Sequence, residues 1–396
     1  MKEIIWVYDD EEKFSSTWVG QLKKNECVTK KFDPKVMDKD HFDETIRVLS
    51  QRQQLSNENK IFTFGELDID HAGMFFIDYD LFDPDKKSYI TGEKVAYLTR
   101  CFSSCGLIIG VNQHLKKLGT YYFDLKMEGH LSSYCDLNIG EGHLDVNGLW
   151  DEQYTEFRPW NWPNLPHYLD LFREKINNSH KYLDQSITNV LGFDKLIEFV
   201  PLSVREFLGD DPTKITFRQF TLESGNGIIG REKALPEQSI ANISIARISK
   251  WLEQFVLPGQ NILVDAPHLV SRYPSLLLED PTKIETWNKT TELNRTNLGL
   301  DLEQIEKYTF SDLWVSKPTW FWGELSKDPN IEEVQNPWNK KIHEFRFCED
   351  SSKFHNKKDT IEFNIETESP YIRRHVTKPQ FPGVNYQPKI RLLSAE

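Results

Sequence analysis

Acidic side chains follow two apolar segments in the first part of the chain. Asp9 and Asp10 come directly after the run Glu3–Tyr8, and Asp78 and Asp80 lie at the end of a second run. Carboxylates that meet repel one another unless a cation neutralises them, and hard oxygen ligands of this kind suit Mg²⁺. A cation would also lower the charge cost of a carboxylate attacking phosphorus, which produces an aspartyl phosphate. We therefore assign all four acids as candidate metal ligands.

The elements that would position these acids are predicted from apolar periodicity. Short apolar runs alternate with amphipathic stretches over residues 1–110, which is typical of an α/β fold with a parallel sheet wrapped by helices. The expected strands are Glu3–Tyr8, Cys27–Lys31, Met74–Tyr79, Leu107–Val111 and Tyr154–Phe157, with helices at about 14–22, 40–54, 91–105 and 165–176. In a doubly wound sheet of order 2-1-3-4-5, strands one and three are neighbours, and sites form at their carboxyl ends. Asp9, Asp10 and Asp78 are therefore expected to converge.

A cationic side chain should stand opposite these acids to hold the phosphoryl oxygens. Arg158 follows the last expected strand, Tyr154–Phe157, and precedes a proline, so we assign this catalytic role to it. Lys126 is an alternative, but it lies in residues 112–151, an excursion rich in Gly, His and Asp to which the sequence assigns no local structure.

Three segments together resemble the receiver domain of two-component response regulators: Trp6–Glu12, Phe76–Leu81 and Phe157–Leu165. In that family an acid pair follows strand one, the phosphoacceptor Asp ends strand three, and a Lys-Pro pair follows strand five. The resemblance covers residues 1–178, and it implies a Mg²⁺-dependent domain that accepts phosphate on Asp78. It also implies a histidine kinase or another phosphodonor protein as a partner.

The sequence departs from the family pattern at three places. The hydroxyl position after strand four falls on Val111 or Asn112, so the hydroxyl is missing or replaced by an amide. Arg158 brings a wider planar fork than the family's Lys. The 112–151 excursion replaces the usual fourth helix region, which is part of the family's output face. The alternative interpretation is therefore a relic acid cluster in a receiver-like fold that binds no phosphate.

Composition limits the class of protein. The chain has 396 residues, with 48 Lys and Arg against 61 Asp and Glu and a net charge of −13. This length predicts two or three domains, and the acidic balance disfavours nucleic-acid binding. No apolar run approaches the roughly 18 residues that span a bilayer, and no leader-like segment opens the chain. Five cysteines are an odd number for a disulfide framework, so we expect a cytoplasmic protein in a reducing compartment.

A domain boundary is expected at 177–182, followed by an α+β domain of unknown function over residues 182–396. Its expected elements are a helix at Glu237–Phe255 and strands at Thr216–Leu222, Asn261–Ala266, His343–Cys348, Thr360–Ile365 and Tyr386–Leu393. This domain is the expected site of contact with a protein partner.

Two weaker signals occur in this second half. The segment Gly225–Gly230 formally matches a dinucleotide-binding GxGxxG, but no helix is expected to open directly after it, so a loop is favoured. Asp265 and His268 end a buried strand near Ser271 and Arg272, and this combination could form a catalytic site. The favoured interpretation is an Asp that caps the next helix with a hydrogen-bonded His beside it.

These observations predict a cytoplasmic signalling protein in which the receiver-like domain controls or docks the second domain. One alternative is a non-phosphorylated scaffold attached to an enzyme that works around Asp265 and His268. Another is an interaction or phosphate-sink module without an output activity. Phosphorylation of Asp78 separates these hypotheses, because the scaffold needs none.

Overall fold

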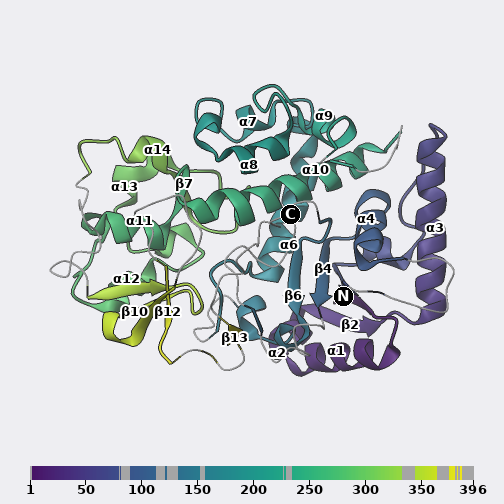
Figure 1. Cartoon of the computed structure of the whole chain (residues 1–396), viewed down its shortest axis with the longest axis horizontal. Coiled ribbons are helices and arrows are strands. Elements are labelled where there is room, and N and C mark those ends of the chain that lie inside the picture. The colour runs from purple at the N-terminus through teal and green to yellow at the C-terminus, as the bar shows by residue number, and fades with distance from the viewer. Residues whose placement is uncertain are drawn as a thin grey trace, which may run out of the picture. The chain divides into compact units, whose positions relative to one another are not determined.

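The computed structural model describes residues 2–79, 81, 90–112, 121–122, 133–151, 157–225, 227–228, 234–331, 344–363, 374–379, 381 and 384–385. The chain divides into two compact units, each built from several segments (Figure 1). Unit 1 comprises Met1–Leu118, Glu128–Trp150 and Leu165–Trp251, and unit 2 comprises Gly119–Met127, Asp151–Asn164 and Leu252–Glu396. The boundary expected at 177–182 thus falls inside unit 1, and residues 151–164, expected in the first domain, belong to unit 2.

Unit 1 contains a five-stranded parallel sheet of order β2-β1-β3-β4-β6. The strands are β1 (Glu3–Tyr8), β2 (Phe32–Val36), β3 (Met74–Asp78), β4 (Leu107–Asn112) and β6 (Leu137–Gly140). The order is the predicted one, in which the first strand lies between the second and third, so the doubly wound α/β class is confirmed for this unit. The second strand and the fifth strand, however, are not the segments that the sequence predicted.

The second strand was misplaced by a few residues. The segment Cys27–Lys31 belongs to helix α2 (Glu26–Lys31), and β2 follows it directly. The reason is local, because the Asn25 side chain accepts hydrogen bonds from the first turn of α2 and thereby caps it. Pro34 lies within β2. It is tolerated because β2 is an edge strand, where a missing N–H group costs no ladder bond.

The fifth strand lies inside the 112–151 excursion. The four residues of β6 pair in parallel with β4, Ile109 opposite Leu137. A Cβ atom on Gly110 would stand only 2.0 Å from Oδ1 of Asn138. A glycine at this position of β4 therefore leaves space for the side chain of Asn138 in β6. Leu137 and Ile139 do alternate with Asn138 and Gly140, but four residues are too short a pattern to identify a strand, which is why the sequence did not reveal it. Most of the expected strand Tyr154–Phe157 lies outside the described residues.

The described residues of unit 1 include several helices. They are α1 (Glu12–Lys24), α2, α3 (Lys39–Asn57), α4 (Gly92–Phe102), α6 (Leu165–Asn178), α7 (Ile187–Val190), α8 (Leu202–Arg205), α9 (Phe217–Leu222) and α10 (Glu237–Trp251). Helix α9 replaces the strand expected at Thr216–Leu222. Thr216 accepts a hydrogen bond from the Gln219 N–H group, and the Gln219 side chain accepts one from the Thr216 N–H group. This capping box starts a helix despite the β-branched residues around it.

Both faces of the parallel sheet are buried, as the consecutive apolar residues predicted. Trp6, Phe75 and Ile108 point to one face and belong to a core cluster with Leu49 of α3 and Leu98 of α4. Their neighbours in the strands are equally inaccessible on the other face, where Phe76 stacks on Trp150. The strand ends, and hence the acids that follow them, are therefore held by packing from two sides.

Unit 2 combines small sheets with short helices. A four-stranded sheet of order β10-β9-β12-β11 is formed by β9 (Phe345–Cys348), β10 (Lys353–Asn356), β11 (Thr360–Phe363) and β12 (Arg374–Thr377). Two-stranded sheets join β7 (Leu263–Asp265) with β8 (Thr319–Phe321), and β5 (Tyr121–Tyr122) with β13 (Val384–Asn385). The helices are α11 (Ala266–Arg272), α12 (Ile284–Lys289), α13 (Leu302–Ile305) and α14 (Trp322–Leu325). The expected strand Tyr386–Leu393 lies outside the described residues.

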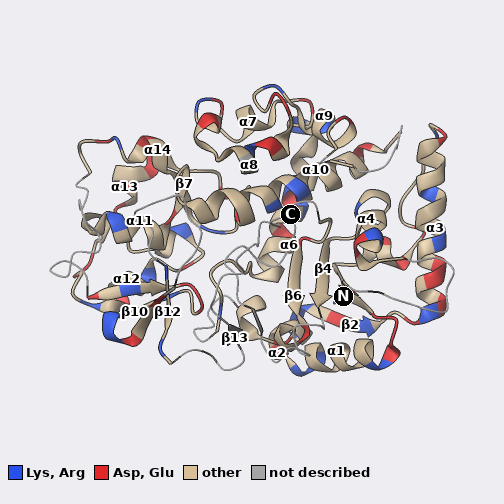
Figure 2. Cartoon of the chain, viewed as in Figure 1, with Lys and Arg blue, Asp and Glu red and all other residues tan. Residues whose placement is uncertain are grey.

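Charges of both signs are distributed along the elements. Figure 2 shows blue and red residues alternating along α3, where Arg47 pairs with Glu44. None of the helices in the described part of the chain is both long and apolar enough to cross a membrane. All five cysteines are free thiols, and Cys101 and Cys105 are buried in the apolar core of unit 1.

Candidate functional site

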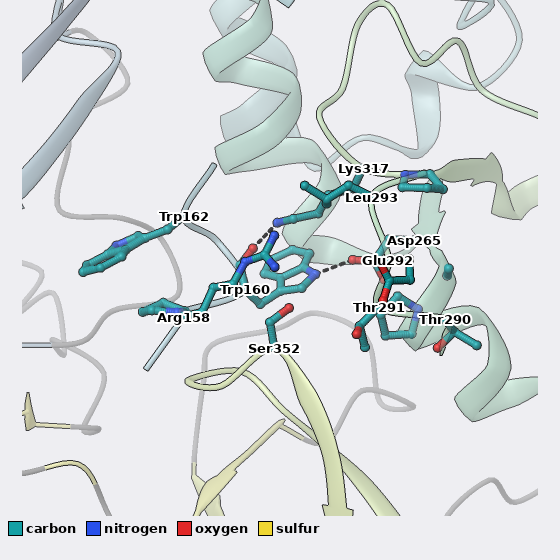
Figure 3. Close-up of a pocket in the computed structure, with 14 residues that line it drawn as sticks. Arg158, Trp160, Trp162, Asp265, Thr290, Thr291, Glu292, Leu293, Lys317 and Ser352 are labelled. Carbon is teal, nitrogen blue, oxygen red and sulfur yellow. Dashed lines mark hydrogen bonds between the residues drawn. The ribbon is translucent and has the colours of Figure 1, made fainter. Parts of the chain in front are cut away.

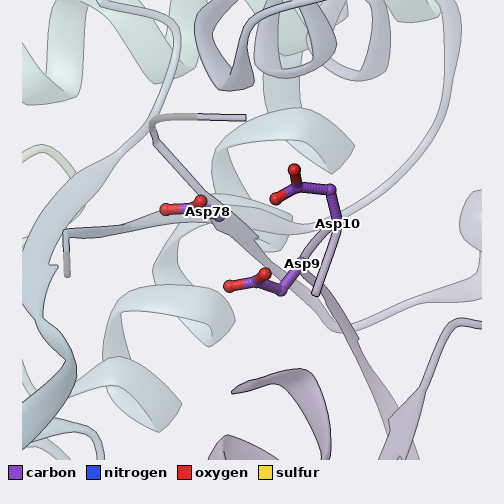
Figure 4. Close-up of side chains that lie close together, drawn as sticks. All are labelled: Asp9, Asp10 and Asp78. Atoms are coloured by element: carbon purple, nitrogen blue, oxygen red, sulfur yellow. The ribbon is translucent and has the colours of Figure 1, made fainter. Parts of the chain in front are cut away.

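The three acids expected to converge lie together at the carboxyl ends of β1 and β3. Asp9 and Asp10 follow β1, Asp78 is the last residue of β3, and the parallel register makes both strands end at the same edge. One carboxylate oxygen from each acid lies within 4.8 Å of the other two. Figure 4 shows the three carboxylates directed into one space. Asp80, the fourth candidate ligand, lies outside the described residues.

The cluster concentrates negative charge in a poorly solvated place. Asp9 and Asp78 are each only 4 % exposed, whereas Asp10 is exposed. The pKa of Asp9 is raised to about 7, chiefly by burial and also by the charges of Asp78 and Asp10, against the opposing hydrogen bond from the Glu11 N–H group. That N–H group donates to Oδ1 of Asp9 over 2.8 Å. A cation between the three carboxylates would remove this electrostatic cost.

The start of helix α4 lies directly against the end of β3. A Cβ atom on Gly92 would stand 2.2 Å from the carbonyl oxygen of Asp78, so no side chain fits at this position. Thr91 caps the helix by accepting a hydrogen bond from the Lys94 N–H group over 3.2 Å. On the other side, the N–H group of Tyr79 donates to the Val111 carbonyl oxygen over 2.9 Å. The backbone around Asp78 is therefore held between α4 and β4.

The neighbouring strands end in residues that differ from the receiver pattern. Asn112 is the last residue of β4, so an amide occupies the place of the family's hydroxyl. Strand β6 ends at Gly140 and is followed by Glu141, which accepts a hydrogen bond from Trp18 Nε1 over 3.5 Å. The residue that follows the fifth strand is thus an acid and not a cation. The placement of Arg158 after the fifth strand was wrong, because β6 and not Tyr154–Phe157 fills that position.

Arg158 belongs to unit 2, where it lines a small pocket together with Trp160 and Lys317. Its backbone N–H group donates to the carbonyl oxygen of Asp350 over 2.8 Å, in the loop between β9 and β10. Its expected contact with a phosphoryl group on Asp78 stays a prediction. The alternative cation, Lys126, lies outside the described residues.

The favoured interpretation of Asp265 and His268 is confirmed. Asp265 caps helix α11, its Oδ1 accepting the His268 N–H group over 3.2 Å and lying 2.5 Å from His268 Nδ1. His268 Nε2 lies 3.2 Å from Glu349 Oε1 and also contacts Arg374. Burial alone would raise the pKa of Glu349, but Arg374 and His268 hold it below its usual range. Ser271 donates to the Pro267 carbonyl oxygen over 2.8 Å and takes no part in this buried network.

The glycine motif of the second half also lacks the context that nucleotide binding requires. It follows helix α9 and not a strand, and a Cβ atom on Gly227 would stand 2.0 Å from the Phe220 carbonyl oxygen. This glycine therefore serves close packing against α9. Asn226 and the end of the motif lie outside the described residues.

Sequence reasoning missed Glu349 and Arg374, which surround His268, and Lys317, which lines the pocket beside Arg158. No periodicity or motif marks these residues, since each is distant in sequence from its partners. Comparison of the whole chain with protein-family models, with curated proteins and with solved structures gave no match. The functional assignment of unit 1 therefore depends on its strand order and on the acid cluster.

Proposed function

We propose that unit 1 is a regulatory domain that binds a divalent cation at Asp9, Asp10 and Asp78 and accepts a phosphoryl group on Asp78. The observation that supports this proposal is the convergence of three carboxylates within 4.8 Å at adjacent strand ends of a 2-1-3-4-5 sheet. In such sheets, ligands bind outside the carboxyl ends of the strands.

The donor set fits a hard cation. All three ligands are carboxylates. Protein-bound Mg²⁺ is usually coordinated by few carboxylates and retains several water ligands. Asp10 is exposed, so one side of the cluster is open to the waters and to a phosphoryl group. When bound, the cation would supply positive charge to the oxygens of the incoming phosphoryl group.

Asp78 is the carboxylate best placed to attack phosphorus. Asp9 already accepts a hydrogen bond from the Glu11 N–H group, and its raised pKa leaves it partly protonated near neutral pH. Asp78 ends the central strand of the sheet, with its backbone fixed by Gly92 and by the bond from Tyr79 to β4. In the reaction, an Asp78 oxygen forms a bond to phosphorus while the bond from phosphorus to the donor atom breaks. That atom is an imidazole nitrogen in a phosphohistidine and an oxygen in acetyl phosphate, and it leaves with the electron pair.

The regulatory role of unit 1 depends on phosphorylation of Asp78. A histidine kinase or another phosphodonor protein supplies the phosphoryl group, and the phosphorylated form controls or docks the C-terminal part of the chain. Asn112 and Glu141 replace the hydroxyl and the cation that couple phosphorylation to the switch in receiver domains. The response to phosphorylation therefore differs from the family's usual switch, and a partner that carries a cation is one way to complete the site.

Phosphorylation is tested with acetyl phosphate and Mg²⁺ on the full chain, followed by intact mass spectrometry. We expect one added phosphoryl group that hydroxylamine removes, as it removes acyl phosphates. Asp78→Asn should abolish the addition because an amide is a poor nucleophile. Asp33→Asn is the matched control, since Asp33 lies in β2 of the same sheet and pairs with Lys35 outside the cluster.

Three outcomes distinguish the hypotheses. Addition that persists in Asp78→Asn would place the acceptor elsewhere. Mg²⁺ binding without any addition would support the relic cluster, with the unit acting as a scaffold. Absence of both Mg²⁺ binding and phosphate addition would overturn the proposed function altogether.

A further inference from the structure

Unit 2 contains a small pocket built from segments that are far apart in the sequence. It is lined by residues of 158–162, 265–267, 290–293 and 317–318 and by Ser352 (Figure 3). The cavity volume is about 20 Å³, which is room for one water molecule or for the end group of a larger molecule. The pocket lies wholly within unit 2 and is independent of the cation site proposed for unit 1.

Trp160 forms a rigid wall of this pocket. Its backbone N–H group donates to the Glu349 carbonyl oxygen over 2.5 Å, and its indole Nε1 donates to Asp265. Its carbonyl oxygen accepts a hydrogen bond from the Lys317 ammonium group, which also lies 4.2 Å from the centroid of the indole ring. Figure 3 shows Trp160 joined in this way to Lys317 on one side and to Asp265 on the other. A wall with this many fixed contacts is preorganised for a ligand.

Two cationic side chains line the same cavity. Arg158 is 6 % exposed, and Lys317 contributes a buried amine on a partly exposed residue. The buried acid of the pocket, Asp265, already contacts His268 through Oδ1 and Trp160 through Oδ2. The other acid in the lining, Glu292, is exposed. The cations therefore dominate the buried part of the cavity.

We propose that this pocket binds the oxyanion end group of a small molecule, a carboxylate or a phosphate, between Arg158 and Lys317. A planar guanidinium can hold two oxygens of such a group at once, and an ammonium group adds a compact charge. Trp162, which is also nearly buried, lines the cavity as well. The small volume of about 20 Å³ admits the end group alone, so the rest of the ligand lies outside the cavity.

The charge state of Lys317 gives this site a pH signature. The pKa of Lys317 is lowered to about 8, chiefly by burial and also by the charge of Arg158, against the opposing charges of Glu253, Asp265 and Glu349. An anion binds the protonated amine, so affinity should fall as pH rises through 8 and the free site loses its proton. If the protonated form alone binds, the apparent affinity at pH 9 is about tenfold weaker than at pH 7.

The site is tested by calorimetric titration of the full chain with sodium phosphate and, separately, with sodium acetate. The titrations use the Asp78→Asn chain without Mg²⁺, so that anion binding at the acid cluster of unit 1 does not contribute to the measured heat. We expect saturable binding of at least one anion, at least tenfold weaker in Lys317→Met and in Arg158→Gln. Lys327→Met is the matched control, because Lys327 is an exposed lysine of the same unit outside the pocket, and it should bind like the parent. The pH series uses acetate, since phosphate itself changes charge in this range.

The two anions separate the possible ligands, since a site for phosphate end groups prefers phosphate and a site for carboxylates prefers acetate. Thermal melting of each variant without ligand shows whether the variant folds. If Lys317→Met does not fold, the loss of anion binding in Arg158→Gln tests the proposal. No saturable binding of either anion would overturn the proposal. Equal loss in Lys327→Met, or affinity that does not change between pH 7 and pH 9, would contradict it as well.

Discussion

Replacing Asp9 by Asn tests the electrostatics of the acid cluster, because the amide keeps the shape of the carboxyl group but cannot ionise. The pKa of Asp9 is raised from 3.8 to about 7. A pKa difference of about 3 units, at about 1.36 kcal/mol for each unit, gives an upper limit of about 4 kcal/mol for the destabilisation of the folded state by ionised Asp9. Screening by solvent reduces this destabilisation. Charged Asp9 thus destabilises the folded chain above pH 7, and Asp9→Asn should relieve this cost.

The sign of the pH dependence follows from proton binding. Between pH 4 and pH 7 the folded state holds a proton on Asp9 that the unfolded state has lost, so the contribution of Asp9 to stability falls as pH rises. Above pH 7 both states are ionised and the penalty stays constant. The free energy of opening of unit 1 should therefore be similar in both proteins at pH 4 and larger in Asp9→Asn at pH 8.

Magnesium should reduce the difference in stability between the two proteins at pH 8. A ligand that binds the folded state alone at one hundred times its Kd stabilises it by about 2.7 kcal/mol. The parent chain should gain stability of this size at pH 8, and Asp9→Asn, which has lost one ligand, should gain much less. Hydrogen exchange of the amides in β1 and β3 reports this free energy locally. The reasoning is refuted if the variant is no more stable without Mg²⁺ at pH 8, or if both proteins respond equally to it.

Two further substitutions test how the sheet positions the cluster, each followed by urea denaturation. Gly92→Ala places a Cβ atom 2.2 Å from the Asp78 carbonyl oxygen, so it should lower the free energy of unfolding by about 1–3 kcal/mol and weaken Mg²⁺ binding. Gly20→Ala in α1 is the control, because no atom lies within 4 Å of its new Cβ atom, and it should stabilise the chain by about 0.5–1 kcal/mol. An equal effect of both would contradict the close approach of α4 to β3. Asp136→Ala should cost about 3–5 kcal/mol because it leaves buried Arg100 without its ion-pair partner. A loss below 1 kcal/mol would show that this pair does not hold the start of β6.

The sequence by itself determined the central strands and the acids at their ends. The boundaries expected for β1, β3 and β4 agree with the structure within one residue. The physical reason is that a parallel strand covered on both faces must be apolar along its whole length, so its position is written in a few consecutive residues. Asp9, Asp10 and Asp78 could then be placed together because parallel strands end at one edge of the sheet.

Some errors came from local signals that the sequence did contain. The capping box of Thr216 and Gln219 and the Asn25 cap of α2 both mark helix starts in segments interpreted as strands. A strand-like pattern over five to seven residues is a weak signal beside a side chain that satisfies the first N–H groups of a helix. Both helix starts are therefore marked in the sequence itself and do not depend on the tertiary structure.

The remaining features were decided by the tertiary structure alone. The strand β6 forms because its backbone pairs with β4 and because Gly110 leaves space for the side chain of Asn138. Arg158 lies in unit 2 and lines the same pocket as Lys317, although the two residues are far apart in the sequence. Contacts between residues so far apart depend on how the segments pack, and packing leaves no periodic trace in the sequence. The acid cluster was predictable because it follows local strand ends, and the cationic pocket was not because its members meet only in the folded unit.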